Sequence, residues 1–258
     1  MTGPSPLQLE TLQRLFSEED LQEVETSRVP RHIAIIPDGN RRWADLNKED
    51  LEAGHLFGGT KVLFQAVQAA AELGVRAVTF YAFSTENWNR SDEEVGFLME
   101  LLKHNLVDYA ALMLQHGVRL QTIGDLSVLN QETQDLFAQV KELTRGCTTI
   151  DLILAVNYGS RNEICRAAQS LAQQCLEGQI TPSDIDEQRF SRQLDTNPWG
   201  DPELLIRTSG EWRLSNFLLW QMCYCELYVT ETLWPDFQSE TMLAAIKDYQ
   251  KRKRRFGQ

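Results

Sequence analysis

Residues 32–43 read HIAIIPDGNRRW, and this stretch indicates the fold of the chain. Its first half is a short apolar run without polar alternation, which is typical of a strand that is buried on both faces of a parallel sheet. Its second half opens with Asp38-Gly39, a pair that favours a turn. The stretch therefore predicts a buried strand that ends in a polar, cationic loop.

Further apolar runs of strand length follow, at residues 75–83, 118–124, 150–157, 204–208 and 227–230. Between them lie stretches with apolar residues at helical spacing. Buried strands that alternate with helices predict βαβ units and a parallel sheet. We therefore expect an α/β fold in a single domain, with a mostly parallel central sheet of about six strands flanked by helices.

Length, charge and cysteine content narrow the class of protein. The 258 residues suit one or two domains, and the formal net charge of −12 argues against a dedicated nucleic-acid-binding protein. Five cysteines without a CxxC pair argue against a disulfide framework or zinc site and indicate a reducing, cytoplasmic compartment. The apolar runs are far shorter than the roughly 18 residues of a membrane span, so we expect peripheral membrane contact at most.

The first 28 residues differ from the rest of the chain because they are polar and acidic. One face of a helix could be formed by Leu7, Leu9, Leu12, Leu15, Phe16 and Leu21. We interpret residues 1–28 as a helical N-terminal extension that packs on the body, and residues 29–258 as the main domain.

Polar and cationic residues follow four of the six predicted strands. The four segments are 38–43 (DGNRRW), 84–90 (STENWNR), 157–161 (NYGSR) and 207–216 (RTSGEWRLSN). Ligands bind outside the carboxyl ends of the strands in open parallel sheets, so these segments are expected at one edge. The acidic total thus conceals a local cationic pocket.

Two of these segments suit phosphate groups. Gly39 allows close approach of a ligand, and Arg41 and Arg42 add charged donors. Asp38 among these cations is either a salt-bridge partner or a Mg²⁺ ligand shared with phosphate oxygens; the alternative is an ordinary Asp-Gly turn with solvated arginines.

The segment after the fifth strand suits a diphosphate, which needs several convergent donors. Arg207 and Arg213 flank hydroxyl side chains and a glycine. The competing interpretation is a surface ion-pair loop with Glu211.

Other candidate residues keep two interpretations each. Trp88 is an apolar wall of a site or an aromatic that caps the core, and His55 is catalytic or, as a lone histidine more often is, structural. Glu226 either forms an ion pair with an arginine or completes a metal site with Asp38.

The sequence lacks GxxxxGK[ST], GxGxxG, HExxH, GxSxG and DDxxD motifs. These residues together predict a phosphate site with Mg²⁺ and without a covalent nucleophile.

The segments together resemble the cis-prenyltransferase family, typified by bacterial undecaprenyl diphosphate synthase. The resemblance runs from about His32 to Gly257 and rests on HIAIIPDGNRRWA, Gly54-His55, FYAFSTENWNR with Glu94, NYGSR, RTSGEWRLSNFLLWQ, ELYVT and LWPDF. It implies a parallel sheet with an elongated apolar tunnel, homodimers, and a catalytic domain over residues 29–258. It also implies a Mg²⁺-dependent condensation of isopentenyl diphosphate with an allylic diphosphate, giving a Z-polyprenyl diphosphate such as an undecaprenyl-like carrier lipid precursor.

The resemblance assigns roles residue by residue. Asp38 matches the family's metal-binding aspartate, which promotes departure of the allylic leaving group, and Glu226 matches the second acid of the metal site. Asn87 matches the position assigned to proton removal; because an amide is a weak base, we expect it to orient the reacting groups, with relay to His55 or a phosphate oxygen.

The allylic diphosphate cradle matches Gly39, Asn40, Arg41 and Arg42, with Trp43 beside it. The closing loop matches Ser84, Thr85, Glu86, Asn87, Trp88 and Arg90. The isopentenyl diphosphate site matches Arg207, Arg213, Leu214 and Ser215. The ending at residues 254–257 looks like the family tail that reaches the partner's active site.

Three departures from the family pattern concern the substrate side. Leu51 stands where an allylic-phosphate arginine is usual, Pro37 and Arg41 replace the commoner Met and Gly, and Ser160 replaces the second Gly of NYGGR. They point to altered substrate choice or product length. The alternatives are therefore a same-family enzyme that makes a short-chain, branched or cyclised product, and a non-catalytic partner subunit.

Overall fold

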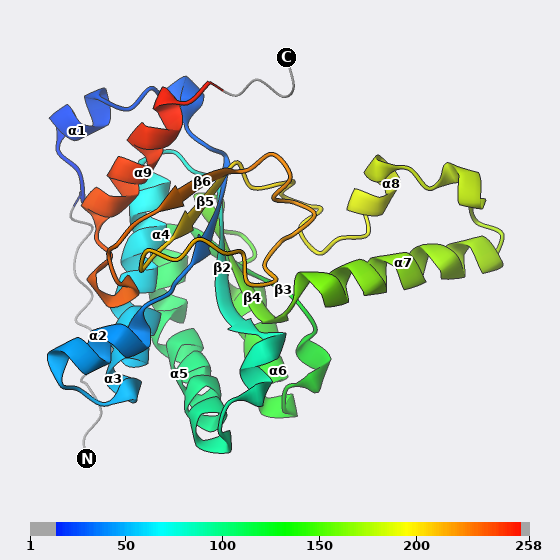
Figure 1. Ribbon diagram of the computed structural model, residues 1–258, viewed down its shortest axis with the longest axis horizontal. Coiled ribbons are helices and arrows are strands. Elements are labelled where there is room, and N and C mark those ends of the chain that lie inside the picture. The colour runs from blue at the N-terminus through cyan, green and yellow to red at the C-terminus, as the bar shows by residue number, and fades with distance from the viewer. Residues whose placement is uncertain (1–13, 254–258) are drawn as a thin grey trace.

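The computed structural model describes residues 14–253, and its core is one parallel sheet (Figure 1). The strand order is β3-β4-β2-β1-β5-β6, and every neighbouring pair is parallel. The strands are β1 (His32–Ile36), β2 (Ala77–Ser84), β3 (Val118–Ile123), β4 (Ile150–Tyr158), β5 (Leu204–Arg207) and β6 (Glu226–Val229). The predicted single-domain α/β fold with six strands is confirmed.

Helices cover both faces of the sheet, which explains why the strands are continuously apolar. They are α1 (Glu18–Gln22), α2 (Asn40–Asn47), α3 (Leu51–Phe57), α4 (Leu63–Glu72), α5 (Asp92–His116), α6 (Gln131–Leu143), α7 (Ser160–Leu176), α8 (Glu187–Ser191) and α9 (Ser239–Lys251). Successive β1 side chains point to opposite faces: Ile33 and Ile35 join one apolar cluster, and Ala34 and Ile36 join the other.

Residues 14–28 pack on the body next to α4 and α9. Phe16 and Val24 are buried in the larger apolar cluster, and the Leu15 amide donates to Glu72 Oε2 at 2.9 Å. Helix in this segment is limited to α1 and a 3₁₀ turn at Thr26–Arg28. Leu7, Leu9 and Leu12 lie outside the described residues, and the boundary at residue 28 stays a prediction.

Two features concern the outline of the molecule. α7 leads away from the sheet and carries α8, so the two form a projecting arm (Figure 1). Within residues 14–253, the helices are all too short or too polar to cross a membrane.

Candidate active site

Four strands deliver their polar segments to the same edge of the sheet. The register pairs Ile36 at the end of β1 with Arg207 at the end of β5, and Ser84 at the end of β2 with Tyr158 at the end of β4. The sequence-based expectation of one shared edge is therefore confirmed.

Asp38 lies at the centre of this edge and is held by its neighbours. Its amide donates to Thr208 Oγ1 at 2.8 Å, and its carbonyl accepts from the Thr208 hydroxyl and the Trp234 amide. The Asp38 carboxylate accepts a hydrogen bond from Arg207 Nη2 at 2.7 Å, and Arg213 Nη2 lies 3.6 Å away. Its side chain is 30% exposed, so the carboxylate still faces the solvent-filled pocket.

The arginines near Asp38 differ in exposure and in their hydrogen-bond partners. Arg207 is buried and also donates to Ser215 Oγ at 3.0 Å and to the Arg213 carbonyl. Arg42 donates to Ser209 Oγ and to Glu211 Oε1, both at 2.7 Å, and Arg213 pairs with the same Glu211. The competing interpretation of this loop, an ion-pair loop with Glu211, is therefore also correct. The side chains of Arg42, Glu211 and Arg213 nevertheless line a pocket.

The loop that carries these groups is conformationally unusual. Ser209, Ser215, Asn216 and Leu218 all have positive φ angles, between 45° and 70°. Such a conformation costs roughly 1–2 kcal/mol for a residue with a Cβ, so the surrounding contacts must over-determine it. Strain of this kind clusters at functional sites.

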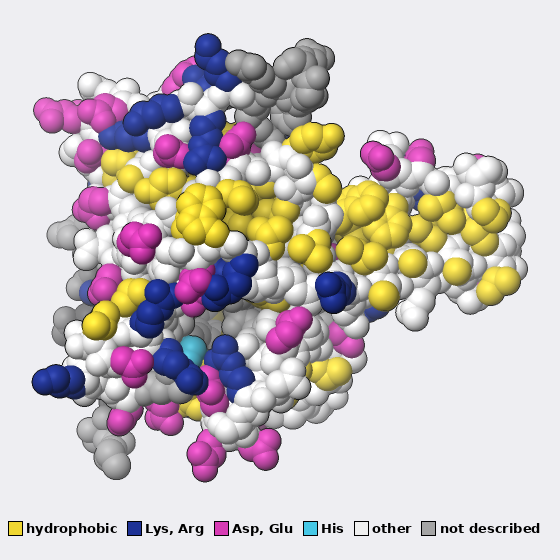
Figure 2. All heavy atoms as spheres, in the orientation of Figure 1, with side chains coloured by type: hydrophobic (Ala, Val, Ile, Leu, Met, Phe, Trp, Pro, Cys, Tyr) yellow, Lys and Arg dark blue, Asp and Glu magenta, His cyan; other side chains and the backbone are white. Residues whose placement is uncertain are grey.

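Asp38, Arg42, Glu211 and Arg213 line one polar pocket with a cavity volume of about 460 Å³, and the buried Arg207 lies outside its lining. Its walls include Pro37, Asp38, Gly39, Asn40, Arg41, Arg42, His55, Arg90, Glu94 and Arg213. Figure 2 shows Lys and Arg side chains gathered around a hollow on this face, with a histidine between them. The predicted local cationic pocket in an acidic protein is present.

The far side of the pocket is organised by Glu94, a residue of the family motif to which the sequence alone assigned no role of its own. Its carboxylate accepts from Arg90 Nη1 at 2.6 Å and lies 3.4 Å from Arg41 Nη2. His55 lies beside them, and its pKa is lowered to about 4 by burial and then by the positive charges of Arg90 and Arg41, with Glu94 opposing. His55 is therefore neutral at pH 7.

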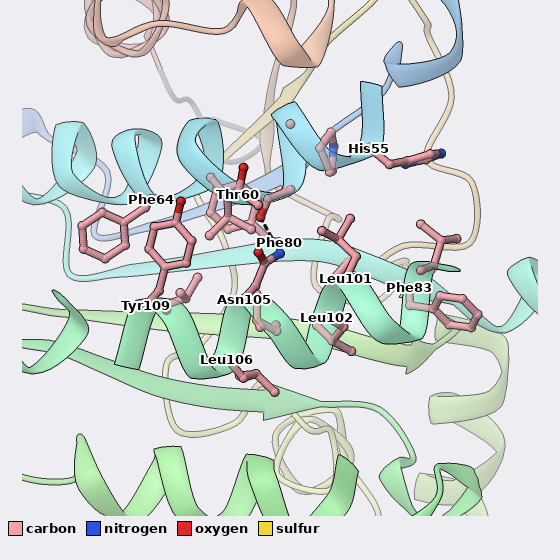
Figure 3. Close-up of a pocket in the computed structure, with 18 of the residues that line it drawn as sticks. His55, Thr60, Phe64, Phe80, Phe83, Leu101, Leu102, Asn105, Leu106 and Tyr109 are labelled. Atoms are coloured by element: carbon pink, nitrogen blue, oxygen red, sulfur yellow. Dashed lines mark hydrogen bonds between the residues drawn. The ribbon is translucent and has the colours of Figure 1, made fainter. Parts of the chain in front are cut away.

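An apolar cavity of about 120 Å³ adjoins the polar pocket, and Pro37, Asn40 and His55 line both. It lies between α5, the α3–α4 stretch and the sheet (Figure 3). Its other walls include Leu63, Phe64, Phe80, Ala82, Phe83, Leu98, Leu101, Leu102, Leu106 and Tyr109. Among the described residues the structure shows this cavity, and it does not show the elongated tunnel that the resemblance implies.

The segment after β2 forms a 3₁₀ turn at Thr85–Asn89 and lies outside the lining of the polar pocket. Asn87 Oδ1 accepts the Ser84 amide at 2.8 Å, which fixes the orientation of the side-chain amide. Trp88 Nε1 donates to Asn157 Oδ1 at 2.8 Å, and its ring packs edge-on against Phe83. The turn is thereby tied to the carboxyl end of β4.

Glu86 and Thr85 link the same turn to the Arg207–Leu218 loop. Glu86 Oε1 accepts from Asn216 Nδ2 at 2.8 Å, and Oε2 accepts from the Thr85 hydroxyl. Burial alone would raise the pKa of Glu86, but these hydrogen bonds hold it below its ordinary value. The contact with Asn216 was not predictable from the sequence, because it depends on the strained backbone of that loop.

Trp43, Leu214 and Glu226 also lie outside the lining of the polar pocket. Trp43 donates from Nε1 to Asp236 at 2.8 Å and packs on Phe57, and Leu214 lines a small surface pocket beside β6. Glu226 begins β6 and is level with Leu204 and, through β5, with Ile33 at the opposite edge of the sheet.

The structure therefore does not bring Glu226 to Asp38 within one chain. Glu226 Oε2 instead accepts from Arg252 Nη1 at 3.0 Å, which is the arginine alternative of the sequence-based interpretation. The physical reason is the parallel register, which sets the two acids about the length of a strand apart. Within the described part of the chain, no group of three or more His, Cys, Asp or Glu side chains could hold a metal ion.

Comparisons with known proteins identify this arrangement. A family model described as "Putative undecaprenyl diphosphate synthase" matches residues 36–257. The chain belongs to this prenyltransferase family. Two curated relatives, both named isoprenyl transferase, are similar to it: that of Prochlorococcus marinus strain SARG is 47% identical, covering 91% of this chain and 88% of its own length, and that of Bacillus subtilis is 45% identical, covering 94% and 92%.

Solved structures agree with this membership. Lavandulyl diphosphate synthase from Lavandula x intermedia, in complex with dimethylallyl diphosphate, has a TM-score of 0.86 at 38% identity, over 90% of this chain and 100% of that one. A probable undecaprenyl diphosphate synthase from Campylobacter jejuni has a TM-score of 0.74 at 33% identity, over 89% and 99%. The chain is thus a prenyltransferase, and the alternative of a non-catalytic subunit loses its support.

Proposed function

We propose that this prenyltransferase condenses isopentenyl diphosphate with an allylic diphosphate to give a Z-polyprenyl diphosphate. The carrying observation is the junction at His55, where an arginine-lined pocket adjoins an apolar cavity. A prenyl diphosphate has the same two halves. Guanidinium groups suit its phosphates, and apolar walls suit its hydrocarbon chain.

Mg²⁺ is the proposed cofactor, and Asp38 is the residue that would hold it. Mg²⁺ in proteins is commonly bound through one or two carboxylates together with substrate phosphates, and Asp38 is a partly exposed carboxylate among arginines. When bound, the ion would neutralise charge on the diphosphate leaving group. Glu226 has no place in this site within one chain, so any role in metal binding needs a second subunit.

The side chains divide between the two diphosphates. Arg207, Arg213 and Ser215 would bind the isopentenyl diphosphate, and Arg41, Arg42 and the Gly39 amide would bind the allylic one. In the ligand-free chain these guanidinium groups are paired with Asp38, Glu94 and Glu211, so substrate phosphates must compete with the carboxylates.

In the reaction a carbon–carbon bond forms, the allylic carbon–oxygen bond breaks, and a proton leaves the isopentenyl unit. The Ser84 amide fixes the orientation of the Asn87 side chain, and an amide is a weak base, so Asn87 Nδ2 would donate to a phosphate and orient it. His55 is neutral at pH 7 and borders both cavities, so a ring nitrogen of His55 is available to accept the proton.

A homodimer is proposed from the open edge of the sheet. Trp212, Tyr224 and Leu227 are 76%, 68% and 39% exposed around β6. Figure 2 shows a hydrophobic band that crosses this face and continues onto the α7–α8 arm. Exposed patches and edge strands of this kind mark association surfaces. Analytical ultracentrifugation should give a species of twice the 29.6 kDa chain mass.

The cytoplasm is the proposed compartment, because all five cysteines are free thiols and the family's substrates are diphosphates. Any membrane contact would be peripheral and would serve release of a long product.

A short-chain or branched product is the second candidate function. The apolar cavity of about 120 Å³ is small, and the neighbour with a TM-score of 0.86 is named a lavandulyl diphosphate synthase bound to dimethylallyl diphosphate. Incubation of the pure protein with labelled isopentenyl diphosphate and dimethylallyl, geranyl or farnesyl diphosphate separates the two. Serial addition of five-carbon units supports the polyprenyl product, and a single condensation or a branched skeleton supports the second candidate.

A further inference from the structure

One wall of the apolar cavity contains a π-helical turn, Gly58–Val62, between α3 and α4. π turns are rare within helices and are frequent at functional sites. The turn is packed closely, because a Cβ atom on Gly58 would lie 2.4 Å from Trp234 Cδ1 and one on Gly59 would lie 3.2 Å from Leu101 Cδ2. The turn therefore contacts α5 directly.

Polar side chains hold this turn in place. Asn105 on α5 donates from Nδ2 to the Gly59 carbonyl at 2.9 Å, and Trp234 donates from Nε1 to the Gly58 carbonyl at 2.7 Å. Figure 3 shows Asn105 pointing from α5 across the cavity toward the wall that carries Thr60. The amide of Asn105 thus bridges two walls of a space whose other lining is mostly apolar.

The bridge is not explained by packing alone. Asn105 Oδ1 is buried and has no hydrogen-bond partner among residues 14–253. An unpaired buried acceptor costs about 1–3 kcal/mol, and a leucine of similar size at this position would avoid that cost. Unlike leucine, the amide forms a hydrogen bond that joins α5 to the π turn.

The bridge lies part-way along the cavity. In Figure 3, His55 and Phe83 lie at one end, Phe64 and Tyr109 at the other, and Asn105 between them. Leu98 and Asn105 are separated by about 10 Å of helix, at 1.5 Å per residue. A prenyl chain advances roughly 5 Å per five-carbon unit, given C–C bonds of about 1.5 Å. The stretch of cavity wall from Leu98 to Asn105 is therefore about two units long.

We propose that Asn105 is a specificity-determining residue for product length, acting through its hydrogen bond to the Gly59 carbonyl. A growing chain that passes the bridge must separate α5 from the π turn, so the bridge favours release of shorter products. The space beyond it is lined by Leu106, Tyr109 and Met113, which suit a longer hydrocarbon chain. This proposal rests on the proposed function of the same site.

The test measures product length by reversed-phase chromatography of labelled products, with dimethylallyl diphosphate as acceptor, because its single five-carbon unit is shorter than the space before the bridge. Asn105→Leu keeps the bulk and removes the hydrogen bond, whereas Asn105→Ala removes both. Val107→Ala is the matched control, because Val107 lies on the same helix and is 61% exposed. Thermal unfolding identifies variants that do not fold; if Asn105→Leu fails to fold, Asn105→Ala and Asn105→Val carry the test.

We expect both Asn105 variants to shift the main product upward by at least one five-carbon unit, while Val107→Ala matches the wild type. Unchanged lengths in folded variants would overturn the proposal. Lengthening by Asn105→Ala alone would also overturn it, since bulk and not the hydrogen bond would then set the limit. Absence of any condensation by the wild type would instead refute the proposed function, so the two failures are distinguishable.

Discussion

Asp38 combines a fixed backbone with a carboxylate that remains partly exposed between two guanidinium groups. Thr208 and Trp234 hold its peptide groups, so the carboxylate position is set by β1, β5 and the turn after β6 together. Replacement by alanine keeps these backbone hydrogen bonds but leaves the buried Arg207 without its carboxylate partner, so thermal unfolding of the variant must accompany the kinetics. Asp38→Ala is expected to lower kcat by about 100-fold or more, as loss of a metal-linked interaction worth several kcal/mol implies.

Steady-state kinetics check this expectation. Asp135→Ala, which removes an exposed carboxylate from α6, serves as the control and should leave kcat within about threefold of the wild type. A wild-type kcat for Asp38→Ala would refute the assigned role.

At the level of single residues, the sequence identified the arginines of the site but not the carboxylates that pair with them. Asp38, Arg207 and Arg213 follow strand ends, and parallel strands bring such residues together. Glu94 and Glu211 each bind two arginines, but their positions depend on side-chain geometry that spacing does not encode. For Glu226 the sequence motif was recognisable, but its position was not. Glu226 lies at the opposite edge of the sheet from Asp38 because of the strand register.

Among the elements, the Arg207–Leu218 loop and α7 support one another. Asn216 accepts the Ser160 amide on its carbonyl at 2.8 Å and the Arg161 amide on Oδ1 at 2.9 Å, so it satisfies the first turn of α7. Ser160, a departure from the family pattern, is fully buried and accepts the Leu219 amide on Oγ at 2.9 Å. The departure therefore strengthens this junction.

Loss of the Asn216 side chain should loosen the isopentenyl diphosphate loop. Asn216→Ala removes a helix-terminal acceptor and the bond to Glu86, and is expected to cost about 1–2 kcal/mol in the free energy of unfolding. We also expect KM for isopentenyl diphosphate to rise several-fold. Urea denaturation and initial-rate kinetics measure the two effects. Asn216→Gly is the matched comparison, since glycine tolerates the φ of +63°; equal KM values for Asn216→Gly and the wild type would contradict the role of the side chain.

Elements were predictable where hydrophobic continuity was strong. All nine residues of β4 are buried, and the sequence-based bounds differ from the structure by one residue. The π turn at Gly58–Val62 was not predictable, because its carbonyl partners Asn105 and Trp234 are distant in sequence.

For the whole molecule, stability should fall in acid because of His32, a buried histidine at the start of β1. His32 is 2% exposed, donates from Nδ1 to the Gly200 carbonyl and accepts from the Thr79 hydroxyl. Burial lowers the pKa of His32 from 6.5 to about 4, although the Gly200 bond and Asp151 oppose the shift.

The sign follows from linkage. The unfolded chain binds a proton at His32 below pH 6.5 while the folded chain does not until about pH 4. Stability is therefore full above pH 6.5 and is lost as the pH falls toward 4, by about 3 kcal/mol from this group. Urea unfolding at pH 7 and pH 4.5 should show the loss, and His32→Gln should reduce it; an identical pH dependence in the variant would contradict this source.

The central claim is that one chain joins a cationic diphosphate pocket to an apolar cavity in order to condense two prenyl diphosphates. The most direct measurement is incorporation of labelled isopentenyl diphosphate into longer products, with Mg²⁺ and an allylic diphosphate, followed by NMR of the new double bond. The account predicts Z-configured prenyl diphosphates whose formation stops in EDTA and resumes with Mg²⁺. No incorporation with dimethylallyl, geranyl or farnesyl acceptors, or a new double bond of E geometry, would contradict it.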